Sequence, residues 1–302
     1  MYKLEMVKIN PIFRMQTNVV YPPFKNGRYL EEFFYDFAKN ATFDTKPHAV
    51  YIPAFWTNIQ IHKMFLEKIL IYQKFLDQAV SEYPSGTRFF TVVQHDDGVI
   101  LKLPKNTTVF GTCSGNIPIP LIYEDVIQHL KKKESATPAA KTQLATFVGT
   151  ITHGVRTHLI QAVNQRPGVA LNVQEKWTDS VDSTRASLFI DECLKSRFTL
   201  SPRGYGRSSF RFFEAMVLGS VPVYVWDDKE WLPYKEYLDY SKFSISCHAS
   251  QLGELYDRMN NMSDTEWKQM IEEGKKVAKW FSLEGMSQYI LSVVTMTSVY
   301  MV

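Results

Sequence analysis

The stretch that decides the fold of this chain covers residues 196–228 and has the sequence SRFTLSPRGYGRSSFRFFEAMVLGSVPVYVWDD. Its β-rich beginning is followed by a basic, glycine-containing loop and then by a run of helical periodicity that Ser208 or Ser209 can open. Gly219 predicts the end of that helix, and the apolar residues 221–226 predict a second strand. The stretch therefore predicts one βαβ unit, with its two strands in parallel.

The loop of such a unit is a natural place for an anion. It lies at the carboxyl end of the first strand, beside a helix start whose unpaired backbone N–H groups favour negative charge. Arg203, Arg207 and Arg211 surround this position, and Glu214 lies on the same side of the helix as Arg211. Two interpretations stay open: an i,i+3 ion pair on an ordinary helix, or an arginine that binds a pyrophosphate while the glutamate holds a ribose.

Spaced motifs continue the pattern beyond this unit. They are Ser201-x-x-Gly204, Ser209-x-Arg211-x-x-Glu214-Ala215, Gly219-x-x-Pro222-Val223, Leu232-Pro233-Tyr234, Leu238-Asp239-Tyr240 and Phe243-Ser244-Ile245. In this order they resemble the carboxyl-terminal half of the exostosin family of inverting nucleotide-sugar glycosyltransferases. The chain departs from the family at Thr199 and Ser220, where members commonly have cysteine, and at Tyr240, which replaces the usual tryptophan.

The resemblance implies a GT-B arrangement. This is an α/β fold of two Rossmann-like, doubly wound domains that face a cleft, here with closing helices at the carboxyl end. A chain of 302 residues is long enough for two domains with cores of their own, and residues 131–141 have the composition of an exposed linker. We expect an acceptor-side domain over residues 1–135 and a nucleotide-sugar-binding domain over residues 136–302, with the last helix free to pack back on the first domain.

Strands that alternate with helices predict parallel sheets in both halves. In the first half we expect strands over residues 4–9, 48–53 and 88–94, and helices over residues 29–39 and 58–80. In the second half, outside the βαβ unit, we expect strands over residues 144–148, 169–173 and 242–247, and helices over residues 153–163, 183–195, 249–260, 263–279 and 286–300.

The strand expected over residues 88–94 ends in the turn His95-Asp96-Asp97-Gly98. Polar residues at the carboxyl ends of strands are where such sheets place ligands, although an Asp-Gly turn with a capping aspartate explains the same residues without a ligand. Inversion needs a base for the acceptor hydroxyl, and the resemblance implies that it comes from the first half, across the cleft. The candidates for the base are Asp96, His95 and Glu31, with Asp96 preferred.

The leaving group of the implied reaction is a nucleoside diphosphate, which needs fixed positive charge and N–H dipoles. Gly149 and Arg156 resemble the first βα turn of the family's second half, although Arg156 can also be an ordinary solvated arginine. Asp227 can hold a hydroxyl of the donor sugar, with Trp226 or Tyr205 as an apolar face. The predicted donor-binding residues are Gly149, Arg156, Ser201, Arg203, Gly204, Tyr205, Ser208, Ser209, Arg211, Glu214 and Asp227.

Neither a metal nor another cofactor is expected. Glycosyltransferases of the other common design hold a divalent metal with Asp-x-Asp, and this chain has no such triplet. The adjacent carboxylates Asp96-Asp97 and Asp227-Asp228 should point apart and chelate poorly. The histidines are scattered singly, and three cysteines without a CxxC spacing indicate neither a zinc site nor a disulfide framework.

Composition excludes several other classes of protein. With 45% hydrophobic and 22% charged residues the chain is globular rather than disordered, and a net charge of +3 is too small to argue for nucleic acid. The amino terminus has no long apolar run, so neither a signal peptide nor a membrane anchor is expected. The chain resembles the short soluble exostosins of bacteria and of large DNA viruses of algae, so we expect it in the cytoplasm, or the host cytoplasm if viral.

The resemblance implies inverting, metal-independent transfer of a sugar from a UDP-sugar to a hydroxyl of a glycan. UDP-xylose is the expected donor, following some plant and algal-virus relatives; glucuronic acid, galactose and N-acetylglucosamine donors also occur in the family. The alternative is a catalytically silent nucleotide- or glycan-binding module of the same fold, which keeps the donor pocket but lacks a working base.

Overall fold

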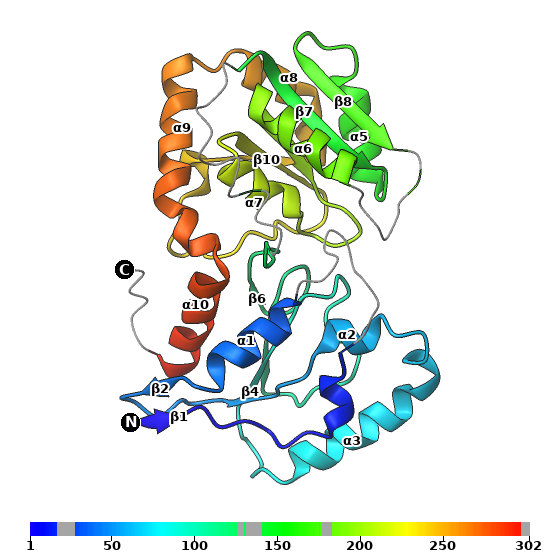
Figure 1. The fold of residues 1–302 in the computed structure, drawn as a ribbon, viewed down its shortest axis with the longest axis vertical. Coiled ribbons are helices and arrows are strands. Elements are labelled where there is room, and N and C mark those ends of the chain that lie inside the picture. The colour runs from blue at the N-terminus through cyan, green and yellow to red at the C-terminus, as the bar shows by residue number, and fades with distance from the viewer. Residues whose placement is uncertain (17–27, 126–129, 131–140, 175, 177–182, 297–302) are drawn as a thin grey trace. The chain divides into compact units, whose positions relative to one another are not determined.

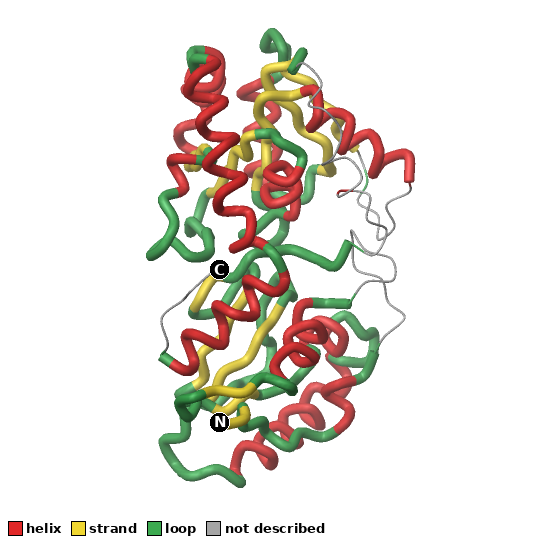
Figure 2. Tube along the Cα trace, turned by 60° about the vertical axis from the view of Figure 1, so that its left-hand side comes forward, coloured by secondary structure: helices red, strands yellow, loops and turns green. Residues whose placement is uncertain are grey.

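The computed structural model describes residues 1–16, 28–125, 130, 141–174, 176 and 183–296. Its described residues form two compact units: residues 1–16, 28–124 and 280–296 make up the first, and the second lies within residues 125–279. The domain boundary predicted between residues 135 and 136 falls outside the described residues. The strands form separate sheets in the two units (Figure 2).

The first unit is built on a parallel sheet with the strand order β3-β4-β5-β6. Its strands are β3 (Val50–Tyr51), β4 (Phe89–Val93), β5 (Thr107–Gly111) and β6 (Ile117–Pro118). Expected strands 48–53 and 88–94 are confirmed as β3 and β4, whereas β5 and β6 were not predicted. A separate, antiparallel two-stranded sheet is formed by β1 (Tyr2–Lys3) and β2 (Thr42–Phe43).

Helices cover both faces of this sheet (Figure 1). On one face, α2 (Trp56–Gln60) and α3 (Ile69–Ser81) share a core with alternate residues of β3 and β4. On the other face, α1 (Leu30–Ala38) packs on β4 and on α10 (Leu283–Thr295). Ring contacts between Phe34 and Phe90 and between Phe110 and Tyr289 join these layers. Both contacts have the edge-to-face geometry that aromatic pairs favour.

Two predictions for the first unit are wrong. Residues 58–80 do not form one helix: the chain leaves the helix after α2, passes through a short 3₁₀ turn at Leu66–Lys68 and re-enters it as α3. The break turns Phe65 into the core, whereas in an unbroken helix it would lie about a third of a turn away from the buried Ile59. Residues 4–9 make only a parallel bridge at Met6 rather than a strand.

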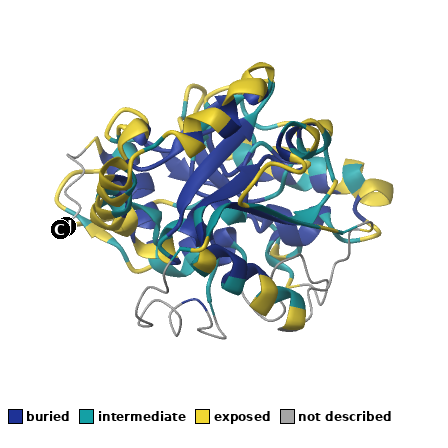
Figure 3. Cartoon of the chain, turned by 90° about the horizontal axis from the view of Figure 1, so that it is seen from above, coloured by how far each residue is buried: buried dark blue, intermediate teal, exposed yellow. Residues whose placement is uncertain are grey.

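The second unit is built on a five-stranded, all-parallel sheet with the order β11-β10-β9-β7-β8. Its strands are β7 (Gln143–Thr150), β8 (Val169–Gln174), β9 (Ser196–Pro202), β10 (Val221–Trp226) and β11 (Ile245–His248). All five were predicted, with shifts of a few residues at their ends. Because such a sheet has helices on both faces, its inner strands β7, β9 and β10 are largely buried (Figure 3), whereas the edge strand β8 is only half-buried.

The helices of the second unit divide between the two faces of the sheet. On one face, α5 (Gly154–Val163) and α8 (Leu252–Asn260) share a core with the valines of β10. On the opposite face lie α6 (Ser183–Lys195) and α7 (Phe210–Val217), and α9 (Asp264–Val277) packs on α7. The fold class is therefore α/β with two Rossmann-like units, as the GT-B class requires. No helix in the described part of the chain is long and apolar enough to cross a bilayer.

Candidate functional site

The βαβ unit predicted from residues 196–228 is present. Its strands run in parallel, with Phe198 opposite Val221. Ser209 is the N-cap of α7, but its side chain makes no capping hydrogen bond, so the cap leaves the first N–H groups of the helix to another acceptor. Gly219, at φ +66°, ends the helix as predicted. The unit has the loop and the helix start that an anion site requires.

Arg203 follows β9 directly and is nearly fully buried. Its Nη1 donates to Oδ1 of Asp227 at 2.8 Å and to Oδ1 of Asp228 at 2.6 Å. The prediction that these adjacent carboxylates point apart is wrong. They converge because a buried guanidinium needs partners for its charge. Two predicted donor-binding residues, Arg203 and Asp227, are therefore in direct contact.

Arg207 adds a second guanidinium to this cluster. Its Nε donates to Oδ2 of Asp228 at 2.8 Å. Burial acts to raise the pKa of Asp228, but the hydrogen bonds from Arg207 and from the N–H of Lys229 outweigh it and lower that pKa. The carbonyl oxygen of Arg207 also accepts from the Tyr224 hydroxyl at 2.6 Å, which ties the loop to the sheet.

Arg156, in the first turn of α5, reaches the same loop. Its Nε donates to the carbonyl of Arg203 at 3.1 Å, and its Nη1 donates to the carbonyl of Thr150 at 2.7 Å. A Cβ on Gly204 would lie 2.9 Å from Nη2 of Arg156, and one on Gly149 would lie 3.8 Å from Nη1. Arg156 is therefore packed against loop backbone, and it is not merely a solvated helix arginine.

Thr152 belongs to this site although the sequence analysis missed it. Its Oγ1 is buried without a hydrogen-bond partner and lies 3.4 Å from the point that a Cβ of Gly204 would occupy. A buried polar group without a partner costs about 1–3 kcal/mol. This hydroxyl, beside Gly204 and the guanidinium of Arg156, makes the loop a candidate site. The sequence feature that could have indicated Thr152 is its position just after the end of β7, where a parallel sheet places ligands.

Two histidines that are far apart in the sequence also reach Asp227. Nδ1 of His153, the N-cap of α5, lies 3.9 Å from Oδ2 of Asp227. Nε2 of His248, the last residue of β11, lies 2.8 Å from the carbonyl oxygen of Asp227. Because the histidines are isolated from one another along the sequence, no local motif predicted that these two lie close together. The sequence feature that could have indicated it is that each follows or ends a strand, since the carboxyl ends of parallel strands share one edge of the sheet.

Arg211 and Glu214 form the i,i+3 ion pair that one of the two interpretations predicted. Nη1 of Arg211 donates to Oε2 of Glu214 at 2.8 Å. The guanidinium also lies over the ring of Phe189 in α6, with Cζ 3.7 Å from the ring centroid. Glu214 is only 4% exposed. The carboxylate thus faces the interior of the unit, where a ribose-binding glutamate would also need to be sheltered from bulk solvent.

The remaining predicted donor-binding residues differ in position. Ser201 is fully buried and donates to the carbonyl of Thr199 at 3.2 Å, so the structure does not bring it to the loop cluster. Ser208 is buried beside the start of α7. Tyr205 is 64% exposed, which leaves its ring open to a ligand.

In the first unit, Glu31 lies buried at the carboxyl edge of the sheet, with 0% exposure. Its Oε1 accepts from the N–H of Thr57 at 3.0 Å, from the hydroxyl of Thr57 at 2.7 Å and from the N–H of Gln94 at 3.1 Å. Oε2 is buried without a partner. Burial raises the pKa of Glu31 against the effect of these hydrogen bonds. The carboxyl group is therefore enclosed by neutral donors on one oxygen, and the role of Glu31 as a base stays a prediction.

His95 and Asp96 occupy the turn after β4, as predicted. Nδ1 of His95 accepts from the N–H of Asp97 at 3.2 Å, so the neutral ring carries its proton on Nε2. Burial lowers the pKa of His95 and keeps it neutral. Oδ1 of Asp96 is 3.4 Å from the Cys113 thiol, a weak donor. The preference for Asp96 as the base stays a prediction.

The three cysteines, Cys113, Cys193 and Cys247, are buried and form no disulfide. Burial raises the pKa of Cys193 to about 12 and lowers the pKa of nearby Lys141 to about 8. Within the described residues, no group of three or more metal-ligating side chains is gathered at one point.

A family model described as the Exostosin GT47 domain matches residues 79–262, more than half of the chain. The chain belongs to the exostosin GT47 family. The matched part contains the turn with His95 and Asp96 and the cluster around Arg156 and Arg203. Glu31 lies outside the matched residues.

Two curated plant relatives carry the same family likeness. A probable glycosyltransferase of Arabidopsis thaliana is 29% identical over 142 residues, which are 47% of this chain and 28% of that protein. A probable arabinosyltransferase of the same plant is 33% identical over 134 residues, 43% of this chain and 29% of that protein. This exostosin chain thus spans less than a third of the length of these relatives.

Solved structures resemble the exostosin chain only in general outline. TarM has a TM-score of 0.40 at 8% identity, with 70% of this chain and 51% of that chain covered. WaaG, a glycosyltransferase involved in lipopolysaccharide biosynthesis, has a TM-score of 0.39 at 13% identity, with 88% and 81% covered. The T4 phage BGT in complex with its UDP-glucose substrate has a TM-score of 0.40 at 12% identity, with 82% and 81% covered.

Proposed function

We propose that the protein is an inverting glycosyltransferase that moves a sugar from a UDP-sugar to a hydroxyl of a glycan. Family membership gives the class of reaction. The observation that carries the proposal is the unpartnered, buried hydroxyl of Thr152 beside Gly204 and the guanidinium of Arg156. A diphosphate oxygen is an acceptor that suits both groups.

The chemistry proposed for the second unit is stabilisation of the leaving group. As the bond between C1 of the sugar and the phosphate oxygen breaks, its electron pair stays on that oxygen, and charge grows on the diphosphate. Arg156, Arg203 and the start of α7 supply positive charge and N–H dipoles around it. These groups take the role that a divalent metal has in the other glycosyltransferase design, so we propose a reaction independent of metal and of other cofactors.

Arg203 has to exchange partners when the donor binds. Without ligand, its Nη1 is held by Asp227 and Asp228. A diphosphate competes with both carboxylates for this nitrogen, and hydroxyl groups of the donor sugar are suitable new donors to the carboxylate that is released. Asp227 would in this way hold a sugar hydroxyl.

In the first unit we propose Asp96 as the base. The acceptor hydroxyl forms its bond to C1 of the sugar on the face opposite the leaving UDP, and its proton passes to the Asp96 carboxylate. His95 is unsuited to this step, because Nδ1 is occupied by the N–H of Asp97. Its place beside Asp96 fits a neutral group that shapes the turn.

We propose a UDP-pentose as the donor, with UDP-xylose first. A relative named as a probable arabinosyltransferase supports a pentose. UDP-xylose, UDP-arabinose, UDP-galactose, UDP-glucuronic acid and UDP-N-acetylglucosamine can be ranked by thermal shift. A ligand that binds only the folded state raises stability with the logarithm of its concentration over its Kd, so the true donor should give a larger shift than UDP alone.

The donor site is tested by titrating UDP into the wild-type protein and into Arg203→Ala, Arg211→Ala and Glu214→Ala. Loss of a charge-assisted contact should raise the Kd about tenfold or more for Arg203→Ala. Arg166→Ala is the matched control, because Arg166 is exposed and contacts the ring of Tyr256 instead. Equal UDP affinity in the wild type and in all three site variants would contradict the proposed site.

A silent nucleotide- or glycan-binding module is the second candidate. The observation that favours it is the state of two potential bases: Glu31 is enclosed and His95 is engaged through Nδ1. Release of UDP from the preferred UDP-sugar, measured with an array of glycan acceptors, distinguishes the two functions. Turnover that is lost in Asp96→Asn while UDP still binds supports the transferase.

A further inference from the structure

The side of the first unit that carries α3 exposes several large apolar side chains. Leu70 is 82% exposed and Leu66 is 69% exposed, and the nearby Met64 and Ile71 are exposed as well. Together with Ile100, which is also exposed, these residues form an apolar patch. A single exposed leucine is ordinary, but several gathered on one surface mark a place where another molecule binds.

The patch arises because residues 64–76 are apolar on two sides. Phe65, Tyr72 and Leu76 are buried in the core of the first unit. Leu66 and Leu70, four residues apart across the 3₁₀ turn and the start of α3, lie on the outer side. A helix that packs on a core usually has polar residues on its outer side. Packing of the core therefore does not account for the two exposed leucines.

The loop after the turn at residues 95–98 extends this surface sideways. The N–H of Ile100 donates to Oε1 of Gln60 at 2.9 Å, which holds Ile100 next to the end of α2. Oε1 of Gln73 in α3 accepts from the N–H of Lys102 at 2.8 Å, and Nε2 of Gln73 donates to the carbonyl oxygen of Lys102 at 2.9 Å. These hydrogen bonds fix Ile100 and Lys102 beside residues 60–73.

Exposed lysines border the apolar patch. They are Lys63, Lys68, Lys74, Lys102 and Lys105. The exposed acidic residues of the same surface are fewer: Glu67, Asp77 and, in the neighbouring turn, Asp97. Positive charge is therefore in excess around the patch, which favours a partner with negative charge.

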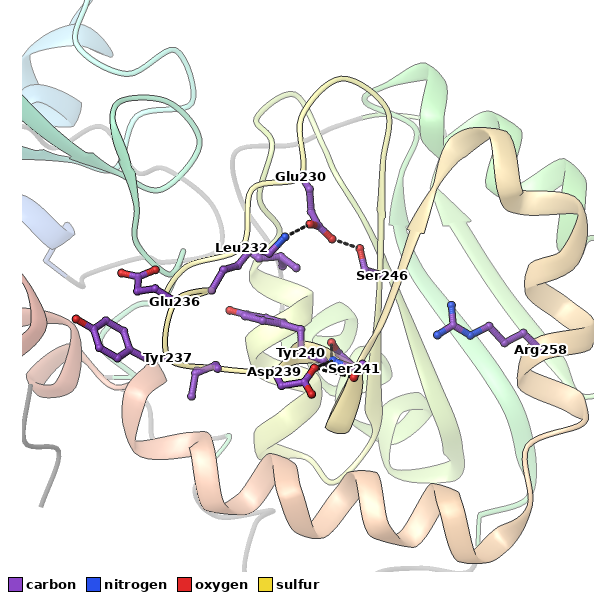
Figure 4. Close-up of a pocket in the computed structure, with 12 residues that line it drawn as sticks. Glu230, Leu232, Glu236, Tyr237, Asp239, Tyr240, Ser241, Ser246 and Arg258 are labelled. Atoms are coloured by element: carbon purple, nitrogen blue, oxygen red, sulfur yellow. Dashed lines mark hydrogen bonds and ion pairs between the residues drawn. The ribbon is translucent and has the colours of Figure 1, made fainter.

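These lysines differ from the charged residues in a groove of the second unit, between residues 230–241 and β11 (Figure 4). In that groove, Glu230 pairs with Lys235 and accepts from the hydroxyl of Ser246 (Figure 4). Around the apolar patch, no ion pair joins the bordering lysines to any described residue. Their ammonium groups can therefore bind an external anion without first leaving a carboxylate.

The composition of the surface distinguishes a lipid partner from a protein partner. Interfaces between proteins are enriched in aromatic residues and arginine and depleted in lysine. Here the exposed side chains are leucine, isoleucine and methionine bordered by lysine, whereas Phe65 and Tyr72 are buried and Phe75 is half-buried. Aliphatic side chains beside lysines suit the boundary between anionic headgroups and acyl chains, because the apolar stem of a lysine stays among apolar groups while its ammonium group reaches a phosphate.

We propose that the first unit binds the surface of an anionic membrane through the apolar patch and the lysines around it. The aliphatic side chains enter the headgroup layer, and the ammonium groups bind lipid phosphates and carboxylates. The contact lies on the bilayer and does not cross it. It is independent of the proposed glycosyltransferase function, because it shares no residue with the donor site or with the candidate bases.

Cosedimentation of the full chain with sucrose-loaded vesicles tests the electrostatic part of this contact. The wild type should bind vesicles of phosphatidylcholine and phosphatidylserine in a three-to-one ratio more tightly than pure phosphatidylcholine, and added salt should weaken this binding. Lys74→Gln should lower the partition coefficient about fivefold, because one lysine near the anionic surface is lost. Lys268→Gln removes an exposed lysine of α9 and is the control that should bind as the wild type does.

The apolar part is tested by replacing Leu66 and Leu70 together with serine. Binding to the same anionic vesicles should fall about tenfold or more, because two aliphatic side chains no longer leave water. Both leucines are exposed, so thermal unfolding should change little. Met296→Ser is the matched control, since Met296 is 73% exposed at the end of α10, among the helices on the other face of the sheet.

Three results would overturn the proposal: no binding at millimolar lipid, equal binding to anionic and neutral vesicles, or equal binding by the wild type and the double serine variant. A fourth is self-association of the wild type that the double serine variant abolishes, measured by sedimentation velocity without lipid. That result would assign the patch to a contact between copies of the chain. Weaker binding in both Lys74→Gln and the double serine variant, with both controls unchanged, supports the membrane contact.

Discussion

At the carboxyl edge of the second unit's sheet, guanidinium groups are paired with carboxylates, whereas at the same edge of the first unit the buried carboxyl group of Glu31 lies among neutral donors. Arg203 and Arg207 face Asp227 and Asp228 in the second unit. In the first unit Glu31 meets the N–H groups of Thr57 and Gln94 and no cation within hydrogen-bond distance among the described residues.

This difference corresponds to two electrostatic tasks. Paired guanidinium groups keep positive charge ready for an anion without changing their own protonation. An acid enclosed by neutral groups instead has a raised pKa, because burial disfavours its charged form. On the proposed function, the first kind of edge would hold the diphosphate, and the turn with His95 and Asp96 at the other edge would take part in proton transfer.

The largest effect, on stability, is expected when Glu31 is removed from the carboxyl edge of the first unit's sheet. Glu31→Ala leaves two buried N–H groups without an acceptor and should lower the free energy of unfolding by about 3 kcal/mol in urea unfolding. Glu32→Ala, which removes one hydrogen bond to the N–H of Tyr29, is the neighbouring control and should cost about 1 kcal/mol.

The pH dependence of Glu31 sharpens this prediction. Because its folded pKa is raised, the folded state binds more protons than the unfolded state above the usual value of 4.5, and stability falls as pH rises through this window. Glu31→Gln keeps the Oε1 acceptor and cannot ionise. Its stability relative to wild type should therefore increase from about pH 5 to about pH 8; a constant difference would contradict a raised pKa.

A smaller effect is expected when one methyl group is added to the loop at the carboxyl edge of the second unit's sheet. Gly204→Ala places a Cβ 2.9 Å from Nη2 of Arg156 and should displace the guanidinium, raising the Kd for UDP about tenfold, or ~1.4 kcal/mol. Gly253→Ala is the matched control, since a Cβ there meets nothing within 4 Å. In helix α8 that control should stabilise the protein by about 0.5–1 kcal/mol. An unchanged UDP affinity in Gly204→Ala would separate Arg156 from the donor site.

The smallest effect is expected at the outer pair of the same cluster. Arg207 and Asp228 are both partly exposed, so Arg207→Ala should change stability by about 0.2–1 kcal/mol. The hydrogen bond that lowers the pKa of Asp228 would disappear, and that pKa should rise toward its usual value in an NMR titration. A pKa that does not move would show that Arg203 and the N–H of Lys229 are enough to hold this carboxylate in its charged form.

Local patterns in the sequence predicted the second unit well, because each of its strands and helices is set by its own periodicity and caps. Ser209 and Gly219 delimit α7 as predicted. The first unit was harder: the break before α3 arises because Phe65 turns into the core, and that depends on partners distant in sequence. The strand β6 has only two residues, and β5, although as long as β4, contains only two large apolar residues in its sequence TTVFG.

Only part of the candidate site could be predicted, again because local motifs are visible in the sequence and contacts between distant segments are not. Arg203 and Gly204 were visible from the motif around them, whereas Thr152, His153 and His248 join the site only because parallel strands end at one edge. The meeting of Asp227 and Asp228 on Arg203 also escaped prediction. Adjacent residues on a regular strand do point apart, but these two follow the end of β10, where the alternation no longer applies.

The contact of Arg203 with two aspartates has a consequence for which anions can bind at this loop. The loop brings its own counter-ions, so an anion that offers only acceptor oxygens would have to displace two carboxylates from Arg203 and would leave them without that donor. The proposed donor carries hydroxyl groups as well as phosphates and can supply partners to both sides of the broken pairs. On the proposed function, selectivity then follows from this exchange of partners and not from net attraction.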